Sequence, residues 1–244
     1  MAARSKTPAT TKSGAVEPAR SSGSEIDTFL AKVKAMTPVA GSGRGRLIFA
    51  MDATMSRQPT WDLALELQGD MFRAVKEVGG LDVQLVYFRG HGETRASKWV
   101  SDPEALAALM RRVACQGGYT QIRKVLAHAR RESEAAKVNA VIYVGDCMEE
   151  NIDHLGDLAG QLGLLGVPVF LFQEGNEPNA ARAFKEIARL TRGAYCRFDA
   201  GSARQLRELL AAVAVYATGG RKALKDFGAA TKSGAAVRLL EQLA

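Results

Sequence analysis

Several features that would narrow the function of this 244-residue sequence are scarce or absent. It has three cysteines but no CxxC pair or Cys/His cluster, which argues against a zinc site and against a disulfide framework. The longest apolar run, 162–172, is interrupted by glycine and proline and is far shorter than the ~20 residues that span a bilayer. Residues 1–23 lack the apolar stretch of a signal peptide, so we expect a cytoplasmic protein that does not enter a membrane.

The formal net charge of +7 is concentrated at the two ends of the chain. Residues 1–46 carry eight Lys and Arg against three Asp and Glu, and residues 219–244 carry five against two. The middle of the chain, 47–218, has 20 basic and 21 acidic residues. Basic ends could bind nucleic acid or another polyanion. A solvated tail is the commoner outcome, so nucleic acid is not the partner that we expect.

Composition divides the chain into four parts. Residues 1–23 have no hydrophobic periodicity and predict a disordered basic tail. Residues 24–45 predict a short helix followed by a linker. Residues 46–217 carry strand and helix patterns throughout and predict one folded domain. Residues 218–244 predict a basic C-terminal extension with a short helix.

Within the expected domain, short apolar runs alternate with helical patterns. The expected strands are 47–51, 81–88, 138–144, 167–172 and 194–198, with another at 93–100 that returns antiparallel through a hairpin. The expected helices are 59–78, 101–113, one that includes 122–129, 152–162, 179–190 and 202–216. This alternation predicts an α/β fold. Its central sheet is Rossmann-like, doubly wound and mostly parallel, with one antiparallel edge strand and helices on both faces.

Oxygen-bearing side chains follow the ends of the expected strands. Asp52 ends the first strand and is followed by two hydroxyls, Thr54 and Ser56. Asp146 ends a later strand, and Thr120 follows a diglycine in a loop before a helix. Ligands of doubly wound sheets bind beyond the carboxyl ends of the strands. Two carboxylates and three hydroxyls suit a hard divalent cation, Mg²⁺ or alternatively Mn²⁺ or Ca²⁺.

These residues resemble the von Willebrand factor A (VWA) domain family and its metal-ion-dependent adhesion site, or MIDAS. The family pattern is Asp-x-Ser-x-Ser, then a Thr after a Gly-rich loop, then an Asp at the end of the fourth main strand. The matching residues here are Asp52, Thr54, Ser56, Thr120 and Asp146. Thr54 stands where Ser is usual, and Gly145 and Cys147 flank the last Asp where Thr and Gly are common. The resemblance covers about residues 46–217.

The resemblance implies a function that is not enzymatic. In VWA domains the metal usually recruits a Glu or Asp from a partner protein, which completes its coordination shell. The chain is therefore expected to be a metal-dependent protein–protein interaction module with an unidentified acidic partner. It is similar to intracellular bacterial members of the family, some of which work beside ATPase or chaperone-like partners.

An enzymatic alternative uses the same residues. A Mg²⁺-dependent phosphohydrolase or phosphotransferase can also place a nucleophilic Asp after the first strand. Thr54 occupies the place where haloacid-dehalogenase-like enzymes carry their second Asp. The sequence also has no P-loop, and no GxGxxG follows the first strand, so nucleotide binding by those routes has no support.

Other residues beside the expected site each allow a functional and a structural interpretation. Arg57 could meet an anionic partner, or it could be an ordinary surface arginine. Cys147 could be redox-active, or it could pack as a small apolar residue. Four acidic residues follow Asp146, namely Glu149, Glu150, Asp153 and Asp157. They could rim the metal. The interpretation that we favour places them at the N-terminus of the following helix, where the helix macrodipole stabilises negative charge.

Overall fold

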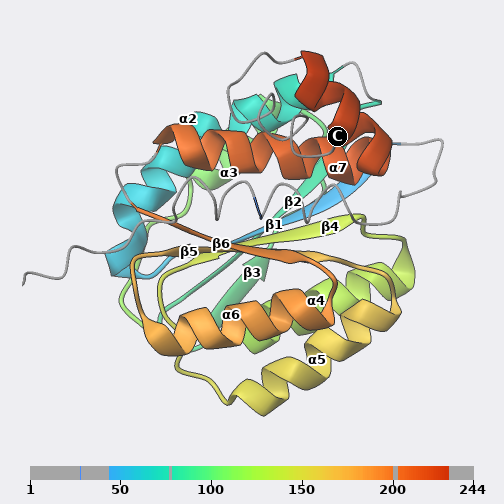
Figure 1. Ribbon diagram of the computed structural model, residues 1–244. Coiled ribbons are helices and arrows are strands. Elements are labelled where there is room, and N and C mark those ends of the chain that lie inside the picture. The colour runs from blue at the N-terminus through green and yellow to red at the C-terminus, as the bar shows by residue number, and fades with distance from the viewer. Residues whose placement is uncertain (1–27, 29–43, 77–78, 200–202, 231–244) are drawn as a thin grey trace, which may run out of the picture.

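A computed structural model describes residues 28, 44–76, 79–199 and 203–230 (Figure 1). The tail expected at 1–23, the short helix expected after Ser24 and the helix expected near the C-terminal end lie outside these described residues. Within them, no helix is both long enough and apolar enough to cross a membrane.

The described chain forms one six-stranded sheet with the order β3-β2-β1-β4-β5-β6. The strands are β1 (Gly45–Asp52), β2 (Leu81–Arg89), β3 (Glu93–Ala96), β4 (Ala140–Gly145), β5 (Val169–Glu174) and β6 (Ala194–Phe198). The helices are η1 (Met55–Arg57), α2 (Gln58–Val75), α3 (Pro103–Met110), α4 (Ile122–Ala135), α5 (Ile152–Leu164), α6 (Pro178–Leu190) and α7 (Ala203–Ala230). All strand pairs are parallel except β2–β3. The predicted α/β fold with one antiparallel edge strand is therefore confirmed.

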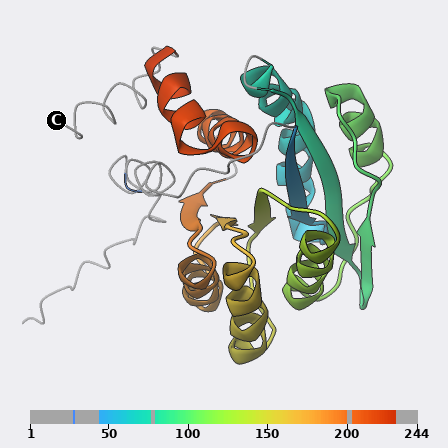
Figure 2. The ribbon, with the colours of Figure 1, turned by 90° about the vertical axis from the view of Figure 1, so that its right-hand side faces the viewer.

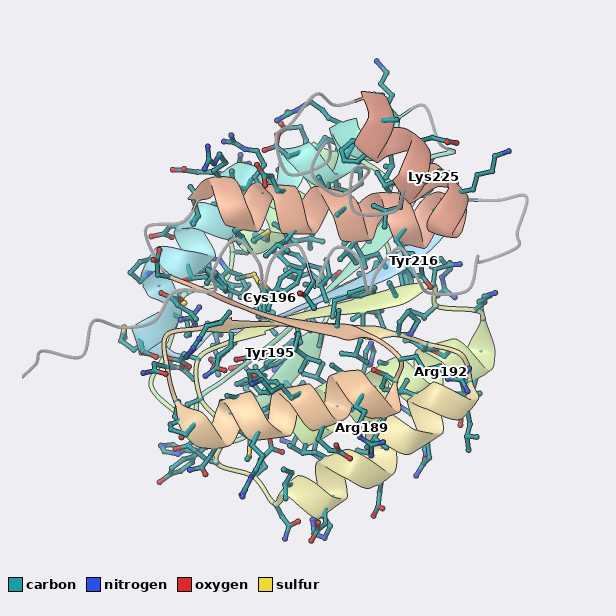
Figure 3. All side chains as sticks on the ribbon, in the orientation of Figure 1. Arg189, Arg192, Tyr195, Cys196, Tyr216 and Lys225 are labelled. Atoms are coloured by element: carbon teal, nitrogen blue, oxygen red, sulfur yellow. The ribbon has the colours of Figure 1, made fainter. Side chains whose placement is uncertain are left out.

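Helices cover both faces of the sheet (Figures 1 and 2). On one face, α2, α3 and α7 pack with the sheet into one hydrophobic core. On the other face, α4, α5 and α6 form a second core. Successive residues of β6 show why both layers form: Cys196 belongs to the first core, whereas Tyr195 packs against the second (Figure 3). The sheet is thus buried on both sides, as expected for parallel strands that are apolar along most of their length.

The antiparallel strand is shorter than the expected 93–100. β3 ends at Ala96, and Val100 returns to pair with Val83 only as an isolated bridge. Between them, the hydroxyl of Ser97 accepts a hydrogen bond from the backbone N–H of Leu85 at 3.0 Å. A side chain has taken the place of a backbone acceptor, which interrupts the regular ladder.

Two helices also differ from their expected limits. The helix expected at 101–113 is shorter in the structure. The Asp102 carboxylate caps α3 by accepting from Ala105 N at 2.8 Å, and α3 ends at Met110. The hydroxyl of Ser101 donates to Asp82 at 2.7 Å. The helix expected at 202–216 continues as α7 to Ala230, with a kink at Gly220, whose φ of 63° and ψ of −156° are not helical.

Candidate metal site

The two aspartates of the expected site end neighbouring parallel strands. Asp52 is the last residue of β1, and Asp146 directly follows β4. β1 pairs with β4, and the sheet order reverses between them, since β2 lies on one side and β5 on the other (Figure 1). Such a switch point leaves a crevice at the carboxyl ends of the strands. The fold therefore brings these two carboxylates together although they are far apart in sequence.

A chain of hydrogen bonds joins four of the five candidate ligands. Oδ1 of Asp52 accepts from the backbone N–H of Thr54 at 2.7 Å, an Asx-type turn that reverses the chain after β1. The hydroxyls of Thr54 and Ser56 are 3.4 Å apart. Ser56 Oγ then donates to Oδ2 of Asp146 at 3.0 Å. The Asp52-x-Thr54-x-Ser56 spacing thus directs both hydroxyls to one place and connects β1 to the end of β4.

The remaining carboxylate oxygens of both aspartates are buried without a partner. Among the described residues, Oδ2 of Asp52 and Oδ1 of Asp146 accept no hydrogen bond. Burial raises the pKa of Asp52 to about 6, and the charge of Asp146 adds to the rise, while hydrogen bonds from Thr54 and the charge of Arg57 oppose it. A buried carboxylate oxygen without a donor is costly. A cation between the two aspartates would remove that cost.

The fifth candidate, Thr120, is held in a loop that is tied to the same region. Gln116 N donates to the carbonyl of Ala53 at 2.9 Å, directly after Asp52. Gly118 approaches the carbonyl of Gly90 so closely that a Cβ would lie 2.0 Å from its oxygen, so only glycine fits there. Thr120 itself is buried, and its hydroxyl accepts from Glu149 N at 3.0 Å. In the described chain Thr120 makes no hydrogen bond to the other four candidates.

The chemistry of this set fits a hard divalent cation. All five side chains offer oxygen, the ligand type that Mg²⁺ prefers. The described residues contain no group of three or more His, Cys, Asp and Glu side chains placed to hold a metal. A cation here would therefore rest on two carboxylates and on neutral hydroxyls, and it would keep coordination positions for water or for a partner's carboxylate.

Arg57 is not the surface residue that one reading of the sequence allowed. Its side chain is only 3% exposed and forms an ion pair with Glu174, which also accepts from the hydroxyl of Thr60. Nη1 of Arg57 lies 3.9 Å from Oδ2 of Asp146. The guanidinium therefore places a fixed positive charge beside the candidate site. Glu174, the last residue of β5, was missed in the sequence, although its place at a strand end was a usable signal.

Glu149 and Glu150 lie near the site but do not begin the helix that follows them. Asn151 caps α5, and Asp153 lies in its first turn, as the sequence suggested for that residue. Asp157 lies beyond that first turn and is exposed. Glu150 instead accepts the N–H groups of Ile122 and Arg123, the first residues of α4. Glu149 accepts Thr120 N at 2.9 Å. Both glutamates thus fix the start of α4 and its preceding loop, where the macrodipole favours negative charge.

The residues on either side of Asp146 have structural explanations. A Cβ on Gly145 would lie 2.6 Å from the hydroxyl oxygen of Tyr143, so the side chain of Tyr143 requires glycine there. Burial raises the pKa of Cys147 to about 12, with the charges of Asp146 and Asp52 adding to the rise. The thiol is therefore protonated at neutral pH, which disfavours the redox-active reading of Cys147.

Comparisons with known proteins agree with this architecture at the level of the fold. No family model and no curated protein sequence matches the chain. Solved structures do match, and they show that the described domain has the VWA fold.

Three of these structures illustrate the likeness. A von Willebrand factor type A protein from Catenulispora acidiphila has a TM-score of 0.59 and 16% identity, and the match covers 74% of this chain and 47% of that one. The SpRpn10 VWA domain has a TM-score of 0.54 and 10% identity, and the match covers 70% of this chain and 95% of that domain. The pilus adhesin SpaC from Lactobacillus rhamnosus GG has a TM-score of 0.55 and 11% identity, and the match covers 77% of this chain and 31% of the adhesin. The chain thus spans less than half of the first of these proteins.

Proposed function

We propose that this chain is a non-enzymatic protein-interaction module that binds an acidic residue of a partner protein through a divalent cation. Asp52, Thr54, Ser56, Thr120 and Asp146 would hold the cation. The observation that carries the proposal is the pair of buried, unpartnered carboxylate oxygens on Asp52 and Asp146. When bound, the cation supplies Lewis acidity and an open coordination position for a carboxylate.

The surface around the site supports an interaction role. The described residues include four exposed large hydrophobic side chains, and two of them adjoin candidate ligands. Met55, 61% exposed, lies between Thr54 and Ser56, and Tyr119, 59% exposed, precedes Thr120. Exposed Met and Tyr are enriched in protein interfaces. The VWA fold, which the SpRpn10 domain and a pilus adhesin share, adds support for binding rather than catalysis.

Calorimetry on chelator-treated, dialysed protein tests the cation. Mg²⁺ or Mn²⁺ should bind the wild-type chain and raise its thermal stability, and Asp52→Ala should remove both effects. Asp157→Ala, which removes an exposed aspartate from α5, is the matched control and should bind metal as the wild type does. If the wild-type protein shows neither heat of binding nor stabilisation at millimolar metal, the proposal is wrong.

Affinity purification from native lysate tests the partner. Proteins retained by the wild-type chain in Mg²⁺, and lost both in EDTA and with Asp52→Ala, would be the metal-dependent partners. Asp157→Ala should retain the same proteins. If the same proteins are retained in EDTA and by the Asp52→Ala variant, the contact is not mediated by the metal.

A further inference from the structure

A basic groove lies between the edge strand β3 and helix α4. Its main cavity has a volume of about 410 Å³, and a second cavity of about 270 Å³ shares Arg123 and Lys124 with it. Val86, Ala96 and Ala127 give the main cavity an apolar part. Its cationic side chains, which define the basic groove here, are Arg95, Arg123, Lys124 and Arg131.

Three of the four cationic side chains of this groove form no ion pair with a carboxylate of the described residues. Neither Arg123 nor Arg131 has a carboxylate oxygen of the described residues within 4.0 Å, and both are exposed. Lys124 Nζ donates to two neutral oxygens, those of the Gly92 backbone at 2.7 Å and the Gln121 side chain at 2.9 Å. Arg95 contacts Glu93 at 3.3 Å but keeps 69% of its side chain exposed. Such a cluster stands out in a domain whose charges otherwise nearly cancel.

The groove leads to the candidate metal site. Thr120, one of the five candidate ligands, lines the second cavity together with Tyr119 and His91. The rings of Tyr119 and His91 lie 5.3 Å apart. A ligand lying along α4 would therefore reach Thr120 at one end. At 1.5 Å per helical residue, Arg123 and Arg131 are about 12 Å apart along the axis, which is about four residues of extended peptide.

We infer that the basic groove binds an extended acidic segment of the partner, adjacent to the residue whose carboxylate would reach the cation. The part concerning the cation rests on the proposed function, whereas the groove stands on its own contacts. β3 pairs only with β2, so no other strand of the described residues occupies its outer edge, where an extended segment could add. The apolar part of the cavity would accept the aliphatic stems of that segment's side chains.

A peptide fits these contacts better than a nucleic acid. Glu150 lines the second cavity and Glu93 adjoins Arg95, so a run of evenly spaced phosphates would meet two carboxylates. Tyr119 is the one Phe, Tyr or Trp side chain among the groove's described lining, so a nucleic acid would find few rings on which its bases could stack. Glutamates and aspartates on a peptide can instead be spaced to match the four cations.

Fluorescence anisotropy with a labelled octapeptide of alternating Glu and Ala tests the inference. Arg123→Glu combined with Arg131→Glu should weaken binding about tenfold or more, since each reversal replaces an attraction with a repulsion. Arg111→Glu combined with Arg112→Glu is the matched control. Both of these arginines are exposed, they follow α3 on the other face of the sheet, and the net charge changes equally. The control should bind within about twofold of the wild type.

Three results would overturn the inference. One is an equal loss with the groove and control variants, which would mean attraction by net charge alone. Another is equally tight binding of the octapeptide with Gln in place of Glu. The third is binding of a labelled single-stranded oligonucleotide that is tighter than peptide binding and depends on the groove arginines.

A Mg²⁺ titration separates the two proposals: groove variants should keep the metal-binding heat, and Asp52→Ala should lose it. If even the wild type lacks that heat while the groove variants lose peptide binding, the cation proposal fails and the groove stands.

Discussion

Nη1 of Arg57 lies 3.9 Å from Oδ2 of Asp146 while the same guanidinium pairs with Glu174. A permanent positive charge therefore stands beside the oxygens that would hold a divalent cation. It competes electrostatically with the metal, because like charges at this range repel appreciably in a partly buried site. It also lessens the repulsion between Asp52 and Asp146 in the metal-free protein.

Replacing Arg57 should therefore separate folding stability from metal affinity. Arg57→Met should lower the free energy of unfolding by about 2–4 kcal/mol, because Glu174 loses its partner. Arg57→Met combined with Glu174→Gln should recover most of that loss, since the neutral amide at position 174 no longer needs a charged partner. Both variants should bind Mg²⁺ about threefold or more tightly than the wild type. Urea unfolding and calorimetry measure the two quantities.

The double variant decides the role of this arginine. Equal Mg²⁺ affinity in the wild-type protein and the double variant would show that Arg57 serves folding only. Weaker affinity in the double variant would show that the arginine positions Asp146 for the metal, contrary to this prediction.

Asp52→Asn should stabilise the metal-free protein while abolishing its response to metal. The pKa of Asp52 is raised from 3.8 to about 6, so the ionised form is less stable in the fold than in the unfolded chain. The neutral amide can keep the bond from Thr54 N through its Oδ1. At pH 7.5 in EDTA, the free energy of unfolding should rise by about 1–3 kcal/mol, and added Mg²⁺ should raise it no further.

The sign of the pH dependence follows from the same shift. Between about pH 4 and pH 6 the folded state binds more protons at Asp52 than the unfolded state does, so the contribution of Asp52 to the free energy of unfolding falls as the pH rises. In EDTA, the difference between Asp52→Asn and the wild type should therefore grow from pH 4 to pH 6 and then level off. A constant difference across that range would mean that Asp52 does not carry the effect.

Much of the fold was predictable because its strands end where apolar runs end. The run before Asp52 and the run before Asp146 predicted β1 and β4 to within two residues at their carboxyl ends. Parallel strands place their carboxyl ends on one edge of a sheet, so the meeting of the two aspartates followed from topology. Whether these residues bind a metal stays a prediction.

The surroundings of the site were not predictable, because they depend on contacts between distant elements. Sequence spacing placed Glu150 near the helix that follows it, whereas its carboxylate caps α4, which precedes it. Arg57 is surrounded by polar neighbours in sequence, and only the approach of Glu174 from β5 explains its burial. Local periodicity carries no information on such pairs.

Tyr143→Phe should leave the stability unchanged or raise it by about 1 kcal/mol. The hydroxyl of Tyr143 is buried below Gly145 and has no hydrogen-bond partner among the described residues. Removing an unpaired buried polar group avoids its desolvation cost, while the ring contacts with Phe88 and Phe184 remain. Thermal unfolding in EDTA measures this. A loss above about 1 kcal/mol would show that the hydroxyl is bonded in solution.

Neighbouring glycines in the loop before Thr120 should respond in opposite ways to the same substitution. A Cβ on Gly118 would lie 2.0 Å from the carbonyl oxygen of Gly90, so Gly118→Ala must push the loop away from the β2–β3 turn. A Cβ on Gly117 would meet nothing within 4 Å. Gly118→Ala should therefore cost about 2–4 kcal/mol of stability, whereas Gly117→Ala should lie within about 1 kcal/mol of the wild type.

The pair also tests whether this loop positions a metal ligand. Because Gly118 holds Thr120 in place through the contact with Gly90, Gly118→Ala should weaken Mg²⁺ binding in protein that is still folded, as monitored by circular dichroism. Gly117→Ala should leave the affinity unchanged. If Gly118→Ala folds and binds Mg²⁺ as tightly as the wild type, Thr120 is not a ligand, and the cation rests on the four candidates at the carboxyl ends of β1 and β4.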